Sequence, residues 1–325
     1  MTPQNQVGGA SNYIMNIKEG LQRLAKVNND DFRLITPYNF VSKKKIGFLQ
    51  YSNAIRKLVK KDFFVHSNSG AGFLLNKIDL ETVHHIPPIF KDHFIHALPA
   101  LYSTYKANEL IAVSEFTSKQ IGESIFRSKN HTIIHNGIDT NFFKNNDIKS
   151  NTPKSNRYKT AIFVGNLVNR KQPWLLLDWL LVNKDFRLII FGEGPLKIPL
   201  SIWTKKLKLN NRVNFMSGDN HKLRNMLWES DIFISPSEME GFGIALIEAV
   251  ASGLPFLSFE TGISPKLAKI GLGATVKNIE TFRNFDINEL ISNFDKEDAW
   301  SHINQNYSID NCVNKTYELY KKFDV

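Results

Sequence analysis

The 325-residue chain has a single cysteine, Cys312, and no run of apolar residues approaches the roughly 20 needed to span a bilayer. One cysteine excludes an internal disulfide framework and any metal site built from several cysteines. The first residues also lack the pattern of a signal peptide. These absences predict a cytoplasmic protein. The composition, 42% hydrophobic and 22% charged, is typical of a folded chain with room for two domains.

Acidic charge is scarce as well: the formal net charge is +10, which favours an anionic partner. Residues 42–61 contain no acid, and apolar residues recur there at helical spacing. The basic residues of this stretch are Lys43, Lys44, Lys45, Arg56, Lys57, Lys60 and Lys61, and the apolar ones are Phe48, Tyr51, Ile55 and Leu58. Two interpretations stay open, a helix resting on an anionic membrane or an ordinary amphipathic helix with a solvated lysine face. Nucleic acid is not expected, because neither interleaved aromatics nor a known binding module accompanies the charge.

Strand-like and helix-like segments alternate along the chain, which predicts an α/β fold with parallel sheets covered by helices. Strands are predicted in a first series at 32–37, 62–67, 81–86, 109–114 and 131–137 and in a second series at "TAIFVG", "FRLIIFGEG", "RVNFMSG", "DIFISPS" and "LPFLSF". Helices are predicted at 12–24, 114–126, 174–181, 222–229 and 243–251.

A polar segment at 145–159 separates the two series, and its Asn, Lys, Ser and Pro content is typical of an exposed linker. We predict two Rossmann-like domains, at 1–138 and 139–305, with parallel sheets facing a central cleft. The last segment, 306–325, is predicted to be a helix that packs back toward the first domain. Ser308 or Asp310 would cap it.

The stretch "SPSEMEGFGIALIEAVASGLP" at 235–255 has two acids, Glu240 and Glu248, on either side of a Gly-Phe-Gly turn that opens a predicted helix. Each glycine in the first turn costs about 1 kcal/mol relative to alanine, which indicates that a ligand approaches this backbone. Free amides at a helix amino terminus suit a diphosphate, and carboxylates accept hydrogen bonds from vicinal hydroxyls. Phosphates between two polyols describe a nucleotide sugar.

The same stretch resembles the Glu-x7-Glu signature of glycosyltransferase family 4, the retaining enzymes with the two-domain GT-B fold. Further matches occur in order along nearly the whole chain, at "VGGASNYIMNIKEGLQRLA", "AVSEFTSKQI", "IIHNGIDTNFF", "FVGNLVNRKQ", "FGEGP" and "SDIFISPS". The resemblance implies sugar transfer from a UDP- or GDP-linked donor. Relatives begin with a short strand, whereas only "MTPQNQV" precedes Gly8. Either the natural start lies upstream, or the first sheet lacks a central strand and is soft.

The resemblance also implies roles for individual residues at the donor site. Lys171 would neutralise the diphosphate leaving group, Glu240 would contact the transferred sugar, and Glu248 would bind the ribose hydroxyls. Backbone contacts to phosphate, sugar or base would come from Gly8, Gly9, Ser217, Gly218, Gly241, Phe242, Gly243 and Ile244.

Two positions depart from the family pattern. Asn166 stands where an arginine is usual, so either Arg170 supplies that cation or the site works with less charge. Lys266, in "TGISPK", stands where an acid is common, so the donor-sugar preference is expected to differ.

Three histidines are candidates on the side of the first domain. "TVHH" resembles the family's Thr-x-His-Asp sequence, which implies that His84 lies near the anomeric carbon and that His85 replaces the aspartate. His66, at the end of "DFFVHS", would line the acceptor side. For each of them the alternative is a hydrogen-bonded structural residue.

No Asp-x-Asp string occurs in the chain, so the metal clamp of the other major glycosyltransferase fold is not expected. Lys171 and the helix terminus would instead stabilise the departing diphosphate, without a metal or cofactor. The family implies retention of anomeric configuration, with a phosphate oxygen accepting the acceptor's proton.

The expected acceptor is lipid-linked or a lipopolysaccharide-type glycan at the cytoplasmic membrane face. The alternatives are a soluble acceptor or a non-catalytic protein that binds sugar nucleotides or glycans. The sequence does not distinguish the donor sugar, its base, the linkage or the oligomeric state.

Overall fold

The computed structural model describes residues 9–28, 59, 63–68, 72–86, 94–146 and 158–323. Several predicted features lie outside these residues: Gly8, the strand at 32–37, the basic stretch at 42–61 apart from Val59, and residues 147–157 of the linker predicted at 145–159. The chain divides into two compact units. Unit 1 contains residues 1–16 and 137–311, and unit 2 contains residues 17–136 and 312–325.

Unit 2 has a parallel four-stranded sheet in the order β1-β2-β3-β4. Its strands are β1 (His66–Asn68), β2 (Leu80–Val83), β3 (Glu109–Ala112) and β4 (His131–Ile133). Its helices include most of α1 (Gly9–Asn28), α3 (Phe94–Lys106) and α4 (Glu115–Gly122). The core of this unit forms because apolar side chains such as Leu110 and Ile121 are fully buried between sheet and helices.

Helix α14 (Ile309–Lys321) begins in unit 1 and continues into unit 2, and α13 (Lys296–Tyr307) precedes it. The break falls at Ser308, whose hydroxyl accepts a hydrogen bond from the backbone N–H of Asn311 at 3.3 Å. Ser308 therefore caps α14, which is one of the two alternatives, Ser308 or Asp310, predicted from the sequence. In unit 2, Gly20 of α1 lies against Val313 of α14, where a Cβ would be 2.6 Å from the valine methyl.

Unit 1 has a parallel six-stranded sheet in the order β10-β9-β8-β5-β6-β7. The strands are β5 (Lys159–Val164), β6 (Phe186–Phe191), β7 (Val213–Met216), β8 (Ile232–Ser235), β9 (Phe256–Phe259) and β10 (Gly273–Val276). Read from β7, this is the 3-2-1-4-5-6 order of a doubly wound nucleotide-binding sheet.

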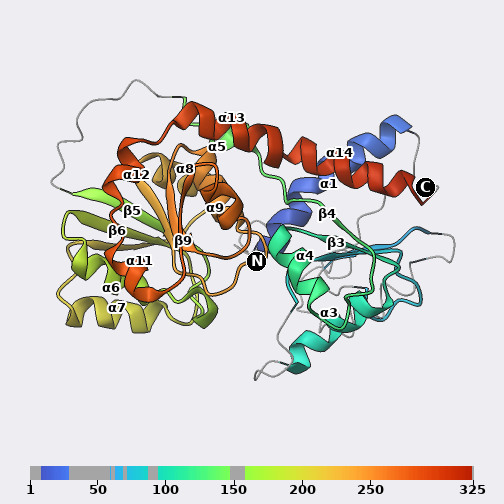
Figure 1. Ribbon diagram of the computed structural model, residues 1–325, viewed down its shortest axis with the longest axis horizontal. Coiled ribbons are helices and arrows are strands. Elements are labelled where there is room, and N and C mark those ends of the chain that lie inside the picture. Colours follow the sequence, from blue (N-terminus) through green and yellow to red (C-terminus); the bar gives the residue numbers. More distant parts are fainter. Residues whose placement is uncertain are drawn as a thin grey trace. The chain divides into compact units, whose positions relative to one another are not determined.

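Helices cover both faces of the unit 1 sheet (Figure 1). Figure 1 shows α6 (Leu175–Val182), α7 (Lys197–Lys206) and α11 (Ile279–Asn284) on one side, and α8 (Asn220–Trp228), α9 (Ile244–Ala251) and α13 on the other. The short helices are α5 (Thr140–Phe143), α10 (Ser264–Ala268), α12 (Asn288–Ser292) and the 3-10 helix η3 (Asn169–Lys171).

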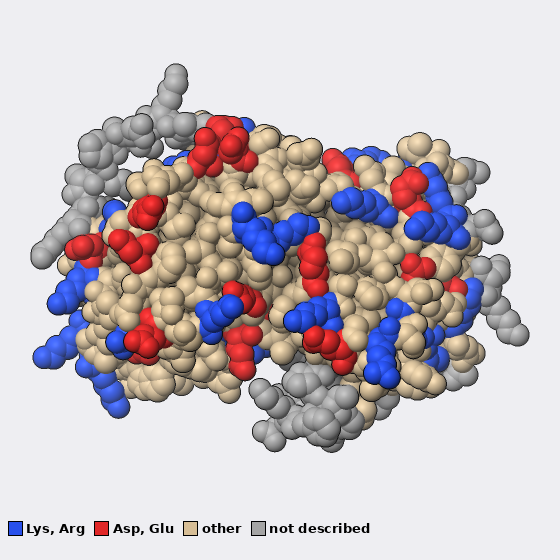
Figure 2. Space-filling view, viewed as in Figure 1, with Lys and Arg blue, Asp and Glu red and all other residues tan. Residues whose placement is uncertain are grey.

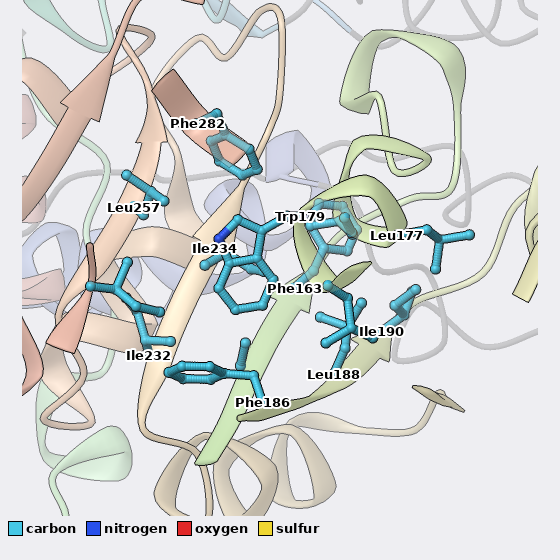
Figure 3. Packing of buried hydrophobic residues seen from close by; sticks show 14 of the residues in the cluster. Phe163, Leu177, Trp179, Phe186, Leu188, Ile190, Ile232, Ile234, Leu257 and Phe282 are labelled. Atoms are coloured by element: carbon cyan, nitrogen blue, oxygen red, sulfur yellow. The ribbon is translucent and has the colours of Figure 1, made fainter. Parts of the chain in front are cut away.

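Alternate residues of the central strands supply the larger hydrophobic core (Figure 3). Phe163 of β5, Ile190 of β6 and Ile234 of β8 are fully buried against Trp179 of α6. Phe282 of α11 completes the same cluster. This packing fixes the strands whose carboxyl ends carry the candidate site.

Strands occur within or beside nine of the ten predicted segments, and the tenth lies outside the described residues. Helices α1, α4, α6, α8 and α9 also occur where the alternation predicted them. Strand β10 was not predicted, because its four residues begin at a glycine and follow a short turn. Among the described residues, no helix is both long and apolar enough to traverse a bilayer.

Candidate active site

The loops that follow β5 and β8 emerge side by side from the middle of the unit 1 sheet. The two strands are hydrogen-bonded neighbours, with Ala161 opposite Ile232 and Ile162 opposite Phe233. The chain proceeds outward in opposite directions from this pair, through β6 and β7 on one side and through β9 and β10 on the other. Open parallel sheets bind ligands at such a reversal, beyond the carboxyl ends of the strands.

The first loop, residues 165–172, is held closely against the turn that follows β6. The N–H of Leu167 donates to the carbonyl oxygen of Glu193 at 2.8 Å, and the N–H of Leu196 donates to that of Leu167 at 3.0 Å. A Cβ on Gly192 would overlap the carbonyl oxygen of Gly165, so glycine is required at this crossing. The "FGEGP" motif therefore supports the loop that carries Arg170 and Lys171.

The second loop, residues 236–243, meets the first through both backbone and side chains. The N–H of Glu238 donates to the carbonyl oxygen of Arg170 at 2.9 Å. Lys171 donates from Nζ to Oε1 of Glu240. Arg170 Nη1 lies 4.0 Å from Oε2 of Glu240 and donates to the carbonyl oxygen of Met239 at 3.2 Å. Two cations from the first loop therefore meet one acid from the second.

This contact sets the charge of Glu240. Burial alone would raise the pKa of its carboxyl group, but the positive charge and hydrogen bond of Lys171, with smaller contributions from Arg170 and Ser237, lower it below the usual value. The Glu240 side chain is 19% exposed, so it remains within reach of a ligand. Glu240 is therefore an ionised hydrogen-bond acceptor at neutral pH.

The Gly-Phe-Gly turn leads directly into α9. Gly243 has φ 102°, a left-handed conformation that favours glycine, and no side chain caps the helix that begins after it. Gly262, also left-handed at φ 58°, lies so close that a Cβ there would overlap the carbonyl oxygen of Phe242. The N–H of Ile263 donates to that oxygen at 2.8 Å, so the turn is fixed from the β9–α10 connection.

Glu248 lies in the second turn of α9 and is only 6% exposed. Burial raises the pKa of its carboxyl group to about 8. Within the described part of the chain, no hydrogen bond or ion pair engages this carboxyl group. A buried carboxyl without partners is unfavourable in its charged form, and ligand hydroxyls would relieve that penalty.

The remaining predicted donor residues are also in unit 1. Asn166 lies in the first loop, but Arg170 rather than Asn166 is beside Glu240. Ser217 and Gly218 follow β7, where Ser217 hydrogen-bonds Glu193. Gly9 is the first residue of α1. Lys266 is exposed on α10. Burial of the His302 ring, together with the positive charge of Lys266, lowers the pKa of His302.

The three histidines belong to unit 2. His66 is hydrogen-bonded through Nδ1 to the Tyr320 hydroxyl at 2.6 Å and through Nε2 to the Thr82 hydroxyl at 2.7 Å. His84 is hydrogen-bonded through Nε2 to Oδ1 of Asn68 at 3.2 Å, and His85 is exposed. Burial, with the nearby His85 and His66, lowers the pKa of His84 to about 3.

A pH-dependent stability is expected from His66. Burial lowers its pKa to about 4, whereas the unfolded side chain titrates near 6.5. The unfolded state therefore binds the extra proton first, and stability is lost as the pH falls from 6.5 to 4. The loss is on the order of 3 kcal/mol. Denaturant unfolding of His66→Gln over this pH range should show a weaker dependence than the wild type, while the control His221→Gln, exposed on α8 of unit 1, should match the wild type. Equal slopes for His66→Gln and wild type would contradict the assignment.

Two site residues have no counterpart in the sequence-based prediction. Ser237 is 1% exposed, hydrogen-bonds Glu240 and lies 3.0 Å from the hydroxyl of Ser235. Gly262 fixes the turn from a distant loop. Ser237 could have been found from its spacing of three residues before Glu240, but Gly262 has no such local signal. In the described segments, no group of three or more His, Cys, Asp or Glu side chains could hold a metal ion.

Part of the chain is similar to a known protein family and to individual glycosyltransferases. Residues 144–304, just under half of the chain, match the family described as glycosyl transferases group 1. An uncharacterized glycosyltransferase of Methanocaldococcus jannaschii is 28% identical over 253 residues, which cover 70% of this chain and 63% of the relative. One component of the phosphatidylinositol N-acetylglucosaminyltransferase of Homo sapiens is 29% identical over 55% of this chain and 39% of its own length. The chain thus spans less than two thirds of either relative.

Among solved structures, HepE of Anabaena in complex with UDP-glucose aligns with a TM-score of 0.74. The alignment covers 98% of this chain and 97% of HepE at 16% sequence identity, so it shows that the two chains share a fold. With the two parallel sheets, this likeness confirms the predicted fold class. The chain therefore has the α/β GT-B fold, and its residues 144–304 match glycosyl transferases group 1.

Proposed function

We propose that the protein is a metal-independent, retaining glycosyltransferase that uses a nucleotide-diphosphate sugar. The observation that carries the proposal is the contact of Lys171 with Glu240. It joins the loops after β5 and β8, and the loop with Glu240 leads directly into the amino terminus of α9. A cation and the amides at a helix amino terminus suit a diphosphate, and an ionised acid beside them suits sugar hydroxyls. The family match over residues 144–304 supports the same reaction class.

In the proposed donor complex, each group has a separate partner. The amides of Gly241 to Ile244, with Lys171 and Arg170, bind the diphosphate, while Glu240 accepts hydrogen bonds from the sugar. Glu248, which lacks a protein partner in the described residues, accepts hydrogen bonds from the ribose hydroxyls. The backbone near Ser217 and Gly218 contacts the base. HepE, which shares the fold, was crystallised with UDP-glucose, and this supports a nucleotide sugar as donor.

The reaction breaks the bond between the anomeric carbon and a diphosphate oxygen and forms a bond from that carbon to an acceptor hydroxyl. Negative charge develops on the leaving diphosphate, where Lys171 and the α9 amides stabilise it. The hydroxyl attacks the face that the diphosphate leaves, and its proton passes to a phosphate oxygen. No protein base is required, and His84, with its lowered pKa, would act as a neutral polar group.

For the acceptor we propose a lipid-linked or cell-surface glycan at the cytoplasmic membrane face. The net charge of +10 supports an anionic surface nearby, and the human relative's name specifies a phosphatidylinositol acceptor. A soluble acceptor, with the same donor chemistry, is the second candidate, because sucrose-phosphate synthase of Thermosynechococcus elongatus, named for a small soluble product, shares the fold at a TM-score of 0.78. A non-catalytic sugar-nucleotide or glycan-binding role is the third.

A donor screen tests the proposal. Thermal unfolding is measured with UDP, GDP, ADP and their sugars in the presence of EDTA, and hydrolysis of each stabilising donor is followed by NMR. One nucleotide family is expected to raise the melting temperature, and the released sugar should keep its anomeric configuration. Binding without hydrolysis or transfer would favour the non-catalytic alternative. Turnover that requires a divalent metal, or inverted product, would contradict the proposed mechanism.

A further inference from the structure

Helix α7 of unit 1 has an apolar outer face. Its inward residues, Leu200 and Thr204, are buried against the sheet. On the outer side, Ile198 is 73% exposed, Ile202 48% and Trp203 47%, and Leu207, directly after the helix, is 38% exposed. A surface helix normally presents polar residues to solvent, so four large apolar side chains on one short segment indicate a binding surface.

The charge beside this face is of one sign. Lys205, Lys206 and Lys208 are exposed, and α7 contains no acidic residue. None of these three lysines has an acidic partner among the residues described, whereas Lys197, at the start of the helix, pairs with Glu193 at 2.7 Å. Figure 2 shows basic side chains projecting at the lower left, where α6 and α7 lie in the same view of Figure 1.

The end of α6 extends the apolar surface. Leu181 is 40% exposed and Val182 44%, and Lys184 follows them. Arg212, in the segment after α7, donates to the carbonyl oxygens of Leu180, Asn183 and Phe186, so this segment is held against the end of α6. The acids on the α6 side are Asp178 and Asp185, and Asp185 lies beside Arg212.

We propose that the outer face of α7 docks on an anionic lipid bilayer surface. Isoleucine, leucine and tryptophan would enter the boundary between headgroups and acyl chains, while the lysines would contact anionic headgroups. A symmetric contact with a second copy of the chain would bring the same lysines against one another, which like-charge repulsion disfavours. Helix α7 is a different segment of the sequence from the basic stretch at 42–61. It is also independent of the proposed function, because transfer to a soluble acceptor is compatible with it.

Vesicle co-sedimentation tests the proposal with the full chain at low salt. We expect binding to phosphatidylcholine vesicles that contain phosphatidylglycerol, and much weaker binding to phosphatidylcholine alone. Ile202→Glu should abolish most of the binding, and Lys205→Glu with Lys206→Glu should lower it by at least about fivefold for each lysine removed. The matched controls are Ile270→Glu, at 49% exposure in the wild type, and Lys269→Glu with Lys277→Glu.

The proposal is overturned if the wild type does not bind, or if the α7 variants bind as well as the wild type. It is also overturned if the control variants lose as much binding as the α7 variants. Sedimentation velocity of the same proteins, without vesicles, detects self-association; a dimer that Ile202→Glu dissociates would assign this face to a second copy instead. Unchanged melting temperatures of all variants, measured alongside, show that each still folds.

Discussion

Replacing Glu240 by glutamine is expected to lower kcat/KM for sugar transfer by roughly 100-fold while the protein remains folded. The amide keeps the shape of the side chain but removes the charge that accepts hydrogen bonds from the sugar and orients Lys171. A hydrogen bond to a charged group is worth about 1.5–3 kcal/mol, and loss of the cation's orientation adds to it. The measurement is initial-rate kinetics with the donor that the thermal screen selects.

Glu238→Gln is the matched control, because Glu238 is exposed and lies two residues before Glu240. It should change kcat/KM by less than about twofold. Lys171→Met should also be severely impaired, and the double variant should lose much less than the sum of both effects, since contacting residues are not independent. Wild-type kinetics for Glu240→Gln would remove the basis of the proposed donor site.

Replacing Glu248 by glutamine is expected to stabilise the ligand-free protein at neutral pH and to remove most of the stabilisation by nucleotide. The folded carboxyl group has a pKa of about 8, and the unfolded one titrates near 4.5. Folding is therefore penalised once the unfolded group ionises, and the penalty grows between pH 4.5 and 8. At pH 7 it is on the order of 3 kcal/mol. The variant's melting temperature should exceed the wild type's at pH 7, and the difference should vanish near pH 4.5.

The same carboxyl group makes nucleotide binding pH-dependent. If the ribose hydroxyls donate to the ionised form, wild-type affinity should rise by up to about tenfold per pH unit between pH 6.5 and 8 and then level off. Isothermal titration of Glu248→Gln should show weak binding that varies little over this range. Glu238→Gln again serves as the control and should follow the wild type. A Glu248→Gln variant that binds nucleotide as tightly as the wild type would contradict the ribose assignment.

The alternation of segments in the sequence was sufficient to predict parallel sheets in two series, because each apolar strand is short and bounded by polar or glycine residues. It could not predict that β5 and β8 are neighbours. That adjacency brings Lys171 to Glu240 across 69 residues of sequence, and only the order of strands creates it. The helix after Gly243 was predictable from its glycines, but its fixation by Gly262 depends on a turn from another strand.

Burial was also beyond sequence reasoning at the decisive positions. Glu248 and Glu240 are both acids near the same turn, yet one is raised in pKa by burial without a partner and the other is lowered by two cations. Helical periodicity indicates only which residues lie on the same face of α9 as Glu248. It does not indicate whether that face is buried or whether the carboxyl group has a partner. For His66, the partner Tyr320 is 254 residues away, so the hydrogen bond between their side chains could not be foreseen.

The ion pair between Lys171 and Glu240 spans the seam between β5 and β8, where the order in which the chain adds strands to the sheet reverses. Ser217 and Gly218 belong to one side of that seam, while α9 belongs to the other. The turn after β6 holds the loop that carries Lys171, whereas the loop beyond β7 can acquire insertions or new side chains while the seam itself stays intact. If Ser217 and Gly218 contact the base, as we propose, this division would let the bound base change without altering the pair of Lys171 and Glu240.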